Sequence, residues 1–68
     1  MKQKAHVGDF IKLADDGILW QVIHVFQLPD GSRRYEAKLH GYDTQHSIYG
    51  RLSIHENDIY EVVKGDDA

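Results

Sequence analysis

The stretch of sequence that decides the fold runs from residue 18 to residue 39 and reads ILWQVIHVFQLPDGSRRYEAKL. Its centre, Leu28 to Ser32, contains a Pro-Asp-Gly run that is typical of a tight turn. Before the turn, the run Val22-Ile23-His24-Val25 is rich in β-branched residues, which favour a strand over a helix. After the turn, apolar and charged residues alternate along residues 33–39, as in a strand with one buried face. The segment therefore predicts a β-hairpin.

Further strands are predicted outward from this hairpin on both sides. Residues 7–13 and 47–54 show apolar positions with a period of two, and residues 60–63 form a short β-prone run. Residues 54–59 lack alternation and are too few for a stable helix, so one helical turn is expected there. Residues 18–28 are apolar on both faces, which fits a long bent strand, with a helix as the competing interpretation. We therefore predict an all-β, five-stranded antiparallel small barrel with one helical turn before the last strand.

The length of 68 residues is enough for one small core. We expect a single domain at residues 7–63, between a flexible N-terminal arm at residues 1–6 and a polar C-terminal tail at residues 64–68. The chain has no cysteine, which excludes disulfides and thiolate zinc sites. It shows neither a secretory signal nor an apolar run long enough to span a bilayer. We expect a soluble, cytoplasmic protein that does not contact membranes.

Four short motifs follow one another along the chain in an order that suggests a family. They are Val7-Gly8-Asp9, Asp16-Gly17 three residues before Trp20, Gly41-Tyr42-Asp43, and Asp58-Ile59. Together they resemble a Src-homology-3-like barrel, and within that group they are similar to Tudor domains. The resemblance implies a non-catalytic binding module, because Tudor domains hold methylated Lys or Arg in a cage of aromatic rings. Trp20 and Tyr42 match two cage positions, whereas Leu39 stands where the family has a tyrosine.

The first functional hypothesis is a module that binds a protein segment at one end of the barrel. Loop aromatics commonly contact peptides, and an acidic rim favours a basic partner. The predicted partner-binding residues are Trp20, Tyr42, Asp15 and Asp16. Trp20 has an equally weighted alternative as a core residue, because a small core gains much from burying one tryptophan.

The alternative hypothesis is a small nucleic-acid-binding or transcription-linked factor that uses an outer sheet face. Interleaved cations and aromatics are typical of such faces. The candidate residues are Arg33, Arg34, Lys38, Tyr49 and Arg51. Glu36 among them and the net charge of −3 favour a solvated surface instead. Self-association through sheet edges is a third possibility.

Catalytic, cofactor and metal sites are not expected. The chain contains five histidines, but no paired carboxylates or cysteines accompany them at a recognised zinc spacing. Gly8, Gly17 and Gly31 are isolated turn residues and form no phosphate loop. No serine lies in a nucleophile-elbow sequence. The sequence therefore predicts a protein that is not an enzyme.

Overall fold

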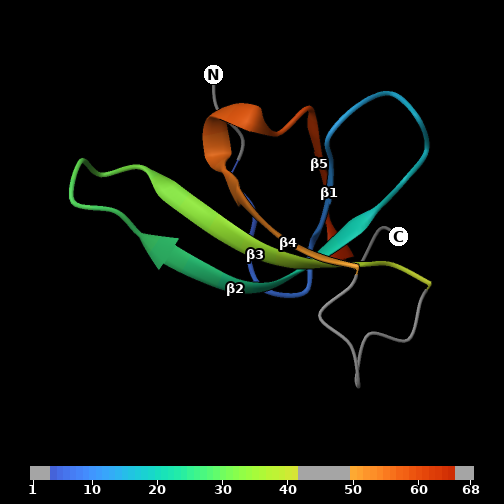
Figure 1. Ribbon diagram of the computed structural model, residues 1–68, viewed down its shortest axis with the longest axis horizontal. Helices are drawn as coiled ribbons and strands as arrows, with labels where there is room; N and C mark the ends of the chain where they lie inside the picture. The colour runs from blue at the N-terminus through green and yellow to red at the C-terminus, as the bar shows by residue number, and fades with distance from the viewer. Residues whose placement is uncertain (1–3, 42–49, 66–68) are drawn as a thin grey trace.

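The computed structural model describes residues 4–41 and 50–65, and within these ranges it contains five antiparallel strands and one short helical turn (Figure 1). The elements are β1 (Phe10–Lys12), β2 (Trp20–Gln27), β3 (Arg33–Leu39), β4 (Arg51–His55), the 3₁₀ turn η1 (Glu56–Asp58) and β5 (Glu61–Val63). The predicted all-β class, the five antiparallel strands and the helical turn before the last strand are confirmed. In the described part of the chain, no helix is long and apolar enough to cross a membrane.

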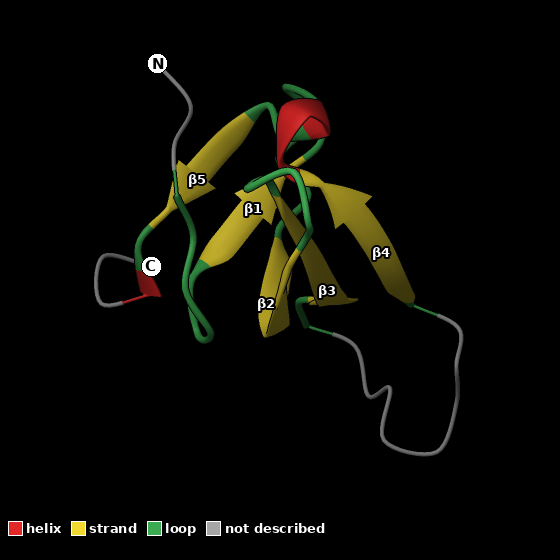
Figure 2. Cartoon of the chain, turned by 90° about the vertical axis from the view of Figure 1, so that its left-hand side faces the viewer, coloured by secondary structure: helices red, strands yellow, loops and turns green. Residues whose placement is uncertain are grey.

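The strands form one sheet in the order β4-β3-β2-β1-β5. The sheet bends strongly, so that β1 and β5 run across the direction of β2, β3 and β4 (Figure 1). A closed barrel needs a ladder of hydrogen bonds all the way round, but pairing among the described strands ends at β4 and at β5. The turn η1, and not a ladder, carries the chain from one edge to the other (Figure 2). The predicted closure is therefore not found, and the sheet is open.

The central hairpin forms as its turn sequence predicts. The N–H of Leu28 donates to the carbonyl of Ser32 at 2.9 Å, and the N–H of Gly31 donates to the carbonyl of Leu28 at 3.0 Å. Gly31 has a φ of +88°, a conformation that glycine adopts without the strain of a Cβ atom. The turn joins β2 and β3 in an antiparallel pair that extends from Trp20 and Leu39 to the tip.

An irregularity in β2 explains why this strand is apolar on both faces. The register with β3 shifts between Val22 and His24, so Ile23 is an extra residue on the β2 side. Strict alternation puts residues three apart on opposite faces, yet Val22 is buried in the core and Val25 packs against it. The shift therefore lets both valines face the core while His24 lies exposed.

The core lies on one face of the bent sheet. Its largest fully buried side chains are Tyr35, Ile11 and Val22. The alternation of residues 33–39 is confirmed, because Tyr35 and Ala37 are buried while Arg34 between the turn and Tyr35 is exposed. Partly buried side chains surround this cluster: Leu13, Trp20, Val25, Leu52, Ile59 and Val62.

Both segments that flank the predicted domain make packed contacts. Ala5 is completely buried, and its N–H donates to the hydroxyl of Tyr35 at 3.3 Å. Asp9 accepts hydrogen bonds from the N–H of Gly65 at 3.0 Å and the N–H of His6 at 2.9 Å. The packed structure therefore includes residues on either side of 7–63.

Candidate functional site

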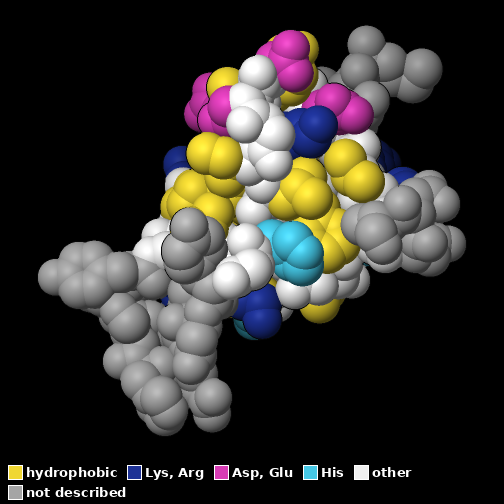
Figure 3. Space-filling model, turned by 90° about the vertical axis from the view of Figure 1, so that its right-hand side faces the viewer, with side chains coloured by type: hydrophobic (Ala, Val, Ile, Leu, Met, Phe, Trp, Pro, Cys, Tyr) yellow, Lys and Arg dark blue, Asp and Glu magenta, His cyan; other side chains and the backbone are white. Residues whose placement is uncertain are grey.

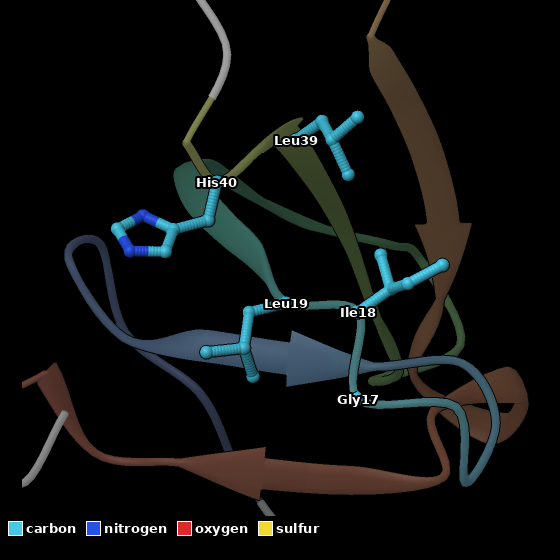
Figure 4. Close-up of a pocket in the computed structure, with 5 residues that line it drawn as sticks. All are labelled: Gly17, Ile18, Leu19, Leu39 and His40. Atoms are coloured by element: carbon cyan, nitrogen blue, oxygen red, sulfur yellow. The ribbon is translucent and has the colours of Figure 1, made fainter.

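A pocket of about 280 Å³ opens where β3 ends and β2 begins (Figure 4). Its lining residues are Gly17, Ile18, Leu19, Leu39 and His40. Two short segments contribute them, one leading into β2 and one leaving β3, so the β2–β3 pairing brings them together. Three of the five are aliphatic, and the pocket is therefore suited to an apolar group.

Backbone hydrogen bonds fix the two walls of the pocket. The N–H of His40 donates to the carbonyl of Leu19 at 2.9 Å and joins the walls directly. The carboxylate of Asp16 accepts the N–H of Ile18 at 3.0 Å, which makes an Asx turn. Gly17, at a φ of +77°, lies between these two residues. The sequence Asp16-Gly17 therefore shapes one wall of the pocket.

The His40 ring is held in place by an aromatic contact from β1. Its centroid lies 4.7 Å from that of Phe10 in an edge-to-face contact with an interplanar angle of 72°. Phe10 is buried, although it lies outside the main core cluster. Edge-to-face packing stabilises such a pair beyond simple burial. The pocket thus has one imidazole at its border that β1 helps to orient.

The surroundings of the pocket are apolar with an acidic border. Ile18 is 45% exposed, so a large part of this residue is accessible beside the pocket. Asp15 and Asp16 precede the lining residues and are exposed. Figure 3, which looks at this end of the molecule, shows hydrophobic side chains gathered around a histidine, with Asp and Glu side chains along one margin.

None of the predicted partner-binding residues that the structure describes lines the pocket itself. Asp15 and Asp16 lie in the loop that leads into the pocket wall. Trp20 is half-buried and packs against the core from its place opposite Leu39, which favours its interpretation as a core residue. Tyr42 lies outside the described residues.

Sequence reasoning missed three residues that line the pocket: Ile18, Leu19 and His40. The signal for the first two was present, since they precede Trp20 in an apolar run directly after a turn. No sequence signal singled out His40, because its position depends on the β2–β3 register.

The candidate nucleic-acid residues divide between two faces. Arg34 and Lys38 lie on the outer face of β3, and Arg51 lies opposite Lys38 on β4. Arg34 donates from Nη1 to the hydroxyl of Ser53 at 3.3 Å. Alternation places Arg33 on the other side of β3, with Tyr35. Tyr49 lies outside the described residues.

Two further side chains belong to this outer face and were missed in the sequence. His24 and Phe26 on β2 are stacked, with ring centroids 4.6 Å apart and an interplanar angle of 11°. They face outward because of the register shift at Ile23, which cannot be recognised from the amino-acid sequence alone.

Within residues 4–41 and 50–65, no three His, Asp or Glu side chains lie close enough together to hold a metal ion. The pocket offers aliphatic contacts, one imidazole and neighbouring carboxylates, an arrangement suited to recognition. Comparisons of the chain with protein-family models, with curated proteins and with solved structures found no match.

Proposed function

We propose that this protein is a non-catalytic interaction module that binds a protein segment in the pocket between Gly17–Leu19 and Leu39–His40. The observation that carries the proposal is a pocket with fixed walls at the end of the sheet where Asp15 and Asp16 lie. A preformed site of this kind loses little conformational entropy when a ligand binds. Ile18 then gives up its contact with water and gains a contact with the ligand.

The chemistry of the pocket selects an aliphatic side chain. Leu39 lines it at the position where the resemblance to Tudor domains implies a tyrosine. Of the two implied cage residues, Trp20 packs against the core and Tyr42 lies outside the described residues. Three of the five described lining residues are aliphatic, and aliphatic side chains lack the ring faces that attract a methylated cation. We therefore propose an aliphatic anchor next to a Lys or Arg, which the carboxylates of Asp15 and Asp16 attract.

The fold supports the same proposal at a coarser level. The order β4-β3-β2-β1-β5 with a 3₁₀ turn before β5 agrees with the resemblance to a Src-homology-3-like, Tudor-like small barrel. We propose that the chain belongs to this architecture, with its edges left open between β4 and β5. A cytoplasmic location agrees with the absence of cysteine.

Trp20 provides the measurement, because it is the single tryptophan of the chain and pairs with Leu39 beside the pocket. The experiment titrates the protein with tryptophan-free peptides that carry a leucine flanked by lysines, and follows the Trp20 emission. The same peptide with glutamates in place of the lysines tests the acidic border. A third peptide carries trimethyl-lysine in place of the leucine.

We expect the leucine–lysine peptide to bind best. The variant Ile18→Glu should weaken its binding at least tenfold, since it puts a charge in the apolar contact. The variant Val7→Glu is the matched control, because Val7 is 65% exposed and does not line the pocket. If the peptide binds Ile18→Glu and Val7→Glu equally well, the proposed site is wrong. If the trimethyl-lysine peptide binds more strongly than the leucine peptide, the proposed aliphatic anchor is wrong.

A further inference from the structure

We propose that the outer face of β2, β3 and β4 is a docking surface for single-stranded nucleic acid, separate from the pocket. We call this surface the basic face, and it consists of His24, Phe26, Arg34, Lys38 and Arg51. The proposal goes beyond the peptide-binding function, because none of these residues lines the pocket. It rests on the combination of an exposed ring stack with a local excess of positive charge.

Strand register places the members of the basic face side by side. Phe26 on β2 lies directly opposite Arg34 on β3, and Lys38 on β3 lies directly opposite Arg51 on β4. Neighbouring strands are about 4.8 Å apart, so each pair is within reach of one nucleotide. Phe26, Arg34 and Arg51 are exposed, which leaves their side chains accessible to a ligand.

The stack of His24 on Phe26 supplies the flat surface. The two rings are nearly parallel, and Phe26 remains 44% exposed although it is a large apolar side chain. Exposed aromatics on a sheet accept unpaired bases by stacking, and this contact tolerates any base because every base has a π-face. A base that stacks here removes apolar ring surface from water and extends a stack that already exists.

The charges match a phosphate backbone. Arg34, Lys38 and Arg51 share this face with Glu36, the one carboxylate among the described residues of β2, β3 and β4 that lie on it, whereas the whole chain has a net charge of −3. Arg34 and Lys38 lie on one side of β3, about 13 Å apart at roughly 3.3 Å per residue. They therefore contact phosphates of different nucleotides along a single strand.

A single strand fits better than a duplex. The bases of a duplex are already stacked and present only their edges in the grooves, so they cannot cover the ring of Phe26. A single strand offers unpaired bases to Phe26 and phosphates to Arg34 at the same time. We therefore expect a higher affinity for a single strand than for a duplex, and little preference among base sequences.

Fluorescence anisotropy with a labelled single strand of about a dozen nucleotides tests the proposal. We expect binding at about 0.02 M salt that weakens toward 0.15 M, where charges are screened more strongly. Three phosphate contacts predict a log–log slope of about −2 for a single strand. A duplex of the same sequence should bind more weakly than the single strand.

Matched variants separate stacking from charge. Phe26→Leu keeps an apolar side chain but removes the ring, and should weaken binding at least fivefold without changing the salt slope. Arg34→Gln should make the slope shallower by about 0.7. The controls are Tyr60→Leu, at an aromatic that is 58% exposed elsewhere, and Lys4→Gln, at an exposed lysine outside the basic face. Circular dichroism checks that each variant remains folded.

Several results would overturn the proposal. One is the absence of binding even at about 0.02 M salt, where electrostatic attraction is strongest. Another is competition by poly-glutamate as strong as that by the oligonucleotide, which would assign the face to acidic protein segments. A third is a dimer in sedimentation that Phe26→Leu dissociates, which would assign it to a second copy of the chain. If Phe26→Leu leaves the affinity for the oligonucleotide unchanged, the bases do not stack on Phe26, and the proposal is wrong.

Discussion

The Nε2 atom of His55 lies 3.0 Å from the hydroxyl oxygen of Ser32, across the corner between the β2–β3 turn and η1. Nδ1 of the same ring accepts the N–H of Asn57 at 3.1 Å, so the proton of the neutral imidazole is on Nε2. His55 therefore donates to Ser32, and Ser32 donates to the carboxylate of Asp30. A nucleophilic serine needs the opposite polarity, with its proton directed to the histidine. This serine–histidine pair is thus a structural contact.

Ser32→Ala should destabilise the protein, because it interrupts this chain of hydrogen bonds at its centre. The expected loss in the free energy of unfolding is about 1 kcal/mol, which corresponds to a decrease in Tm of roughly 4–8 °C for a domain of this size. Ser53→Ala is the control, since Ser53 is exposed and its hydroxyl accepts a hydrogen bond from the exposed Arg34. Thermal melts of both variants make the comparison, and equal Tm values would show that the Ser32 contact does not stabilise the fold.

Asp9 should make stability depend on acidic pH. The N–H of Gly65 is the main cause that holds the pKa of Asp9 below its ordinary value, opposed by partial burial and aided by the N–H of His6 and by Lys64. A lowered pKa in the folded state means that the ionised form stabilises the fold above the unfolded pKa of about 3.9. This contribution is lost as the pH falls through the folded value.

The test is Asp9→Asn followed by urea unfolding at several pH values. We expect the variant to be less stable by about 2 kcal/mol near neutral pH, because hydrogen bonds to a charged group are lost. The gap to the unmodified protein should narrow as the pH falls from about 5 to about 2. Asp15→Asn, at an exposed loop position, is the control for the substitution itself. A gap that stays constant with pH would mean that Asp9 does not contribute through its charge.

Trp20 should behave as a core residue in stability measurements. It is partly exposed and packs against the core cluster, so Trp20→Ala removes less contact area than the truncation of a fully buried tryptophan. Full truncation of a buried tryptophan costs 3–5 kcal/mol, and we expect about 2 kcal/mol here. Ile18→Ala, at a side chain that is 45% exposed, should cost less than about 1 kcal/mol. If the two variants unfold at the same urea concentration, Trp20 is a surface platform instead.

Local sequence signals were sufficient for the strands but not for the sheet as a whole. The Pro-Asp-Gly turn and the alternation around Tyr35 predicted β2, β3 and the turn between them, because both depend on residues close in sequence. Closure depends on whether distant edges pair, and no short pattern reports that. The register shift at Ile23 is similar, since an extra residue is recognised only against its partner strand.

The residues of the candidate site likewise include some that local sequence signals predicted and some that they did not. Asp16-Gly17 was recognisable as a turn, and it forms one wall of the pocket. His40 reaches the pocket only because its N–H bonds the carbonyl of Leu19, which lies 21 residues earlier in the sequence. The sheet face on which Phe26 lies could not be predicted from the sequence, because it depends on the register shift. The burial of Ala5 could not be predicted from the sequence either, because one small apolar residue among polar ones gives no periodic signal.

Tyr35→Phe tests whether the N-terminal segment is part of the folded unit. Tyr35 is completely buried, and its hydroxyl accepts the N–H of Ala5, which is buried as well. The substitution keeps the ring and its packing but leaves that N–H without its partner, so we expect a loss of about 1 kcal/mol in stability. Hydrogen exchange at the Ala5 amide should become faster, because local opening of the segment no longer breaks a hydrogen bond. Tyr60→Phe is the control, since Tyr60 is 58% exposed and should change neither quantity. If Tyr35→Phe leaves both the melting temperature and the Ala5 exchange rate unchanged, the segment does not contribute to the stability of the core.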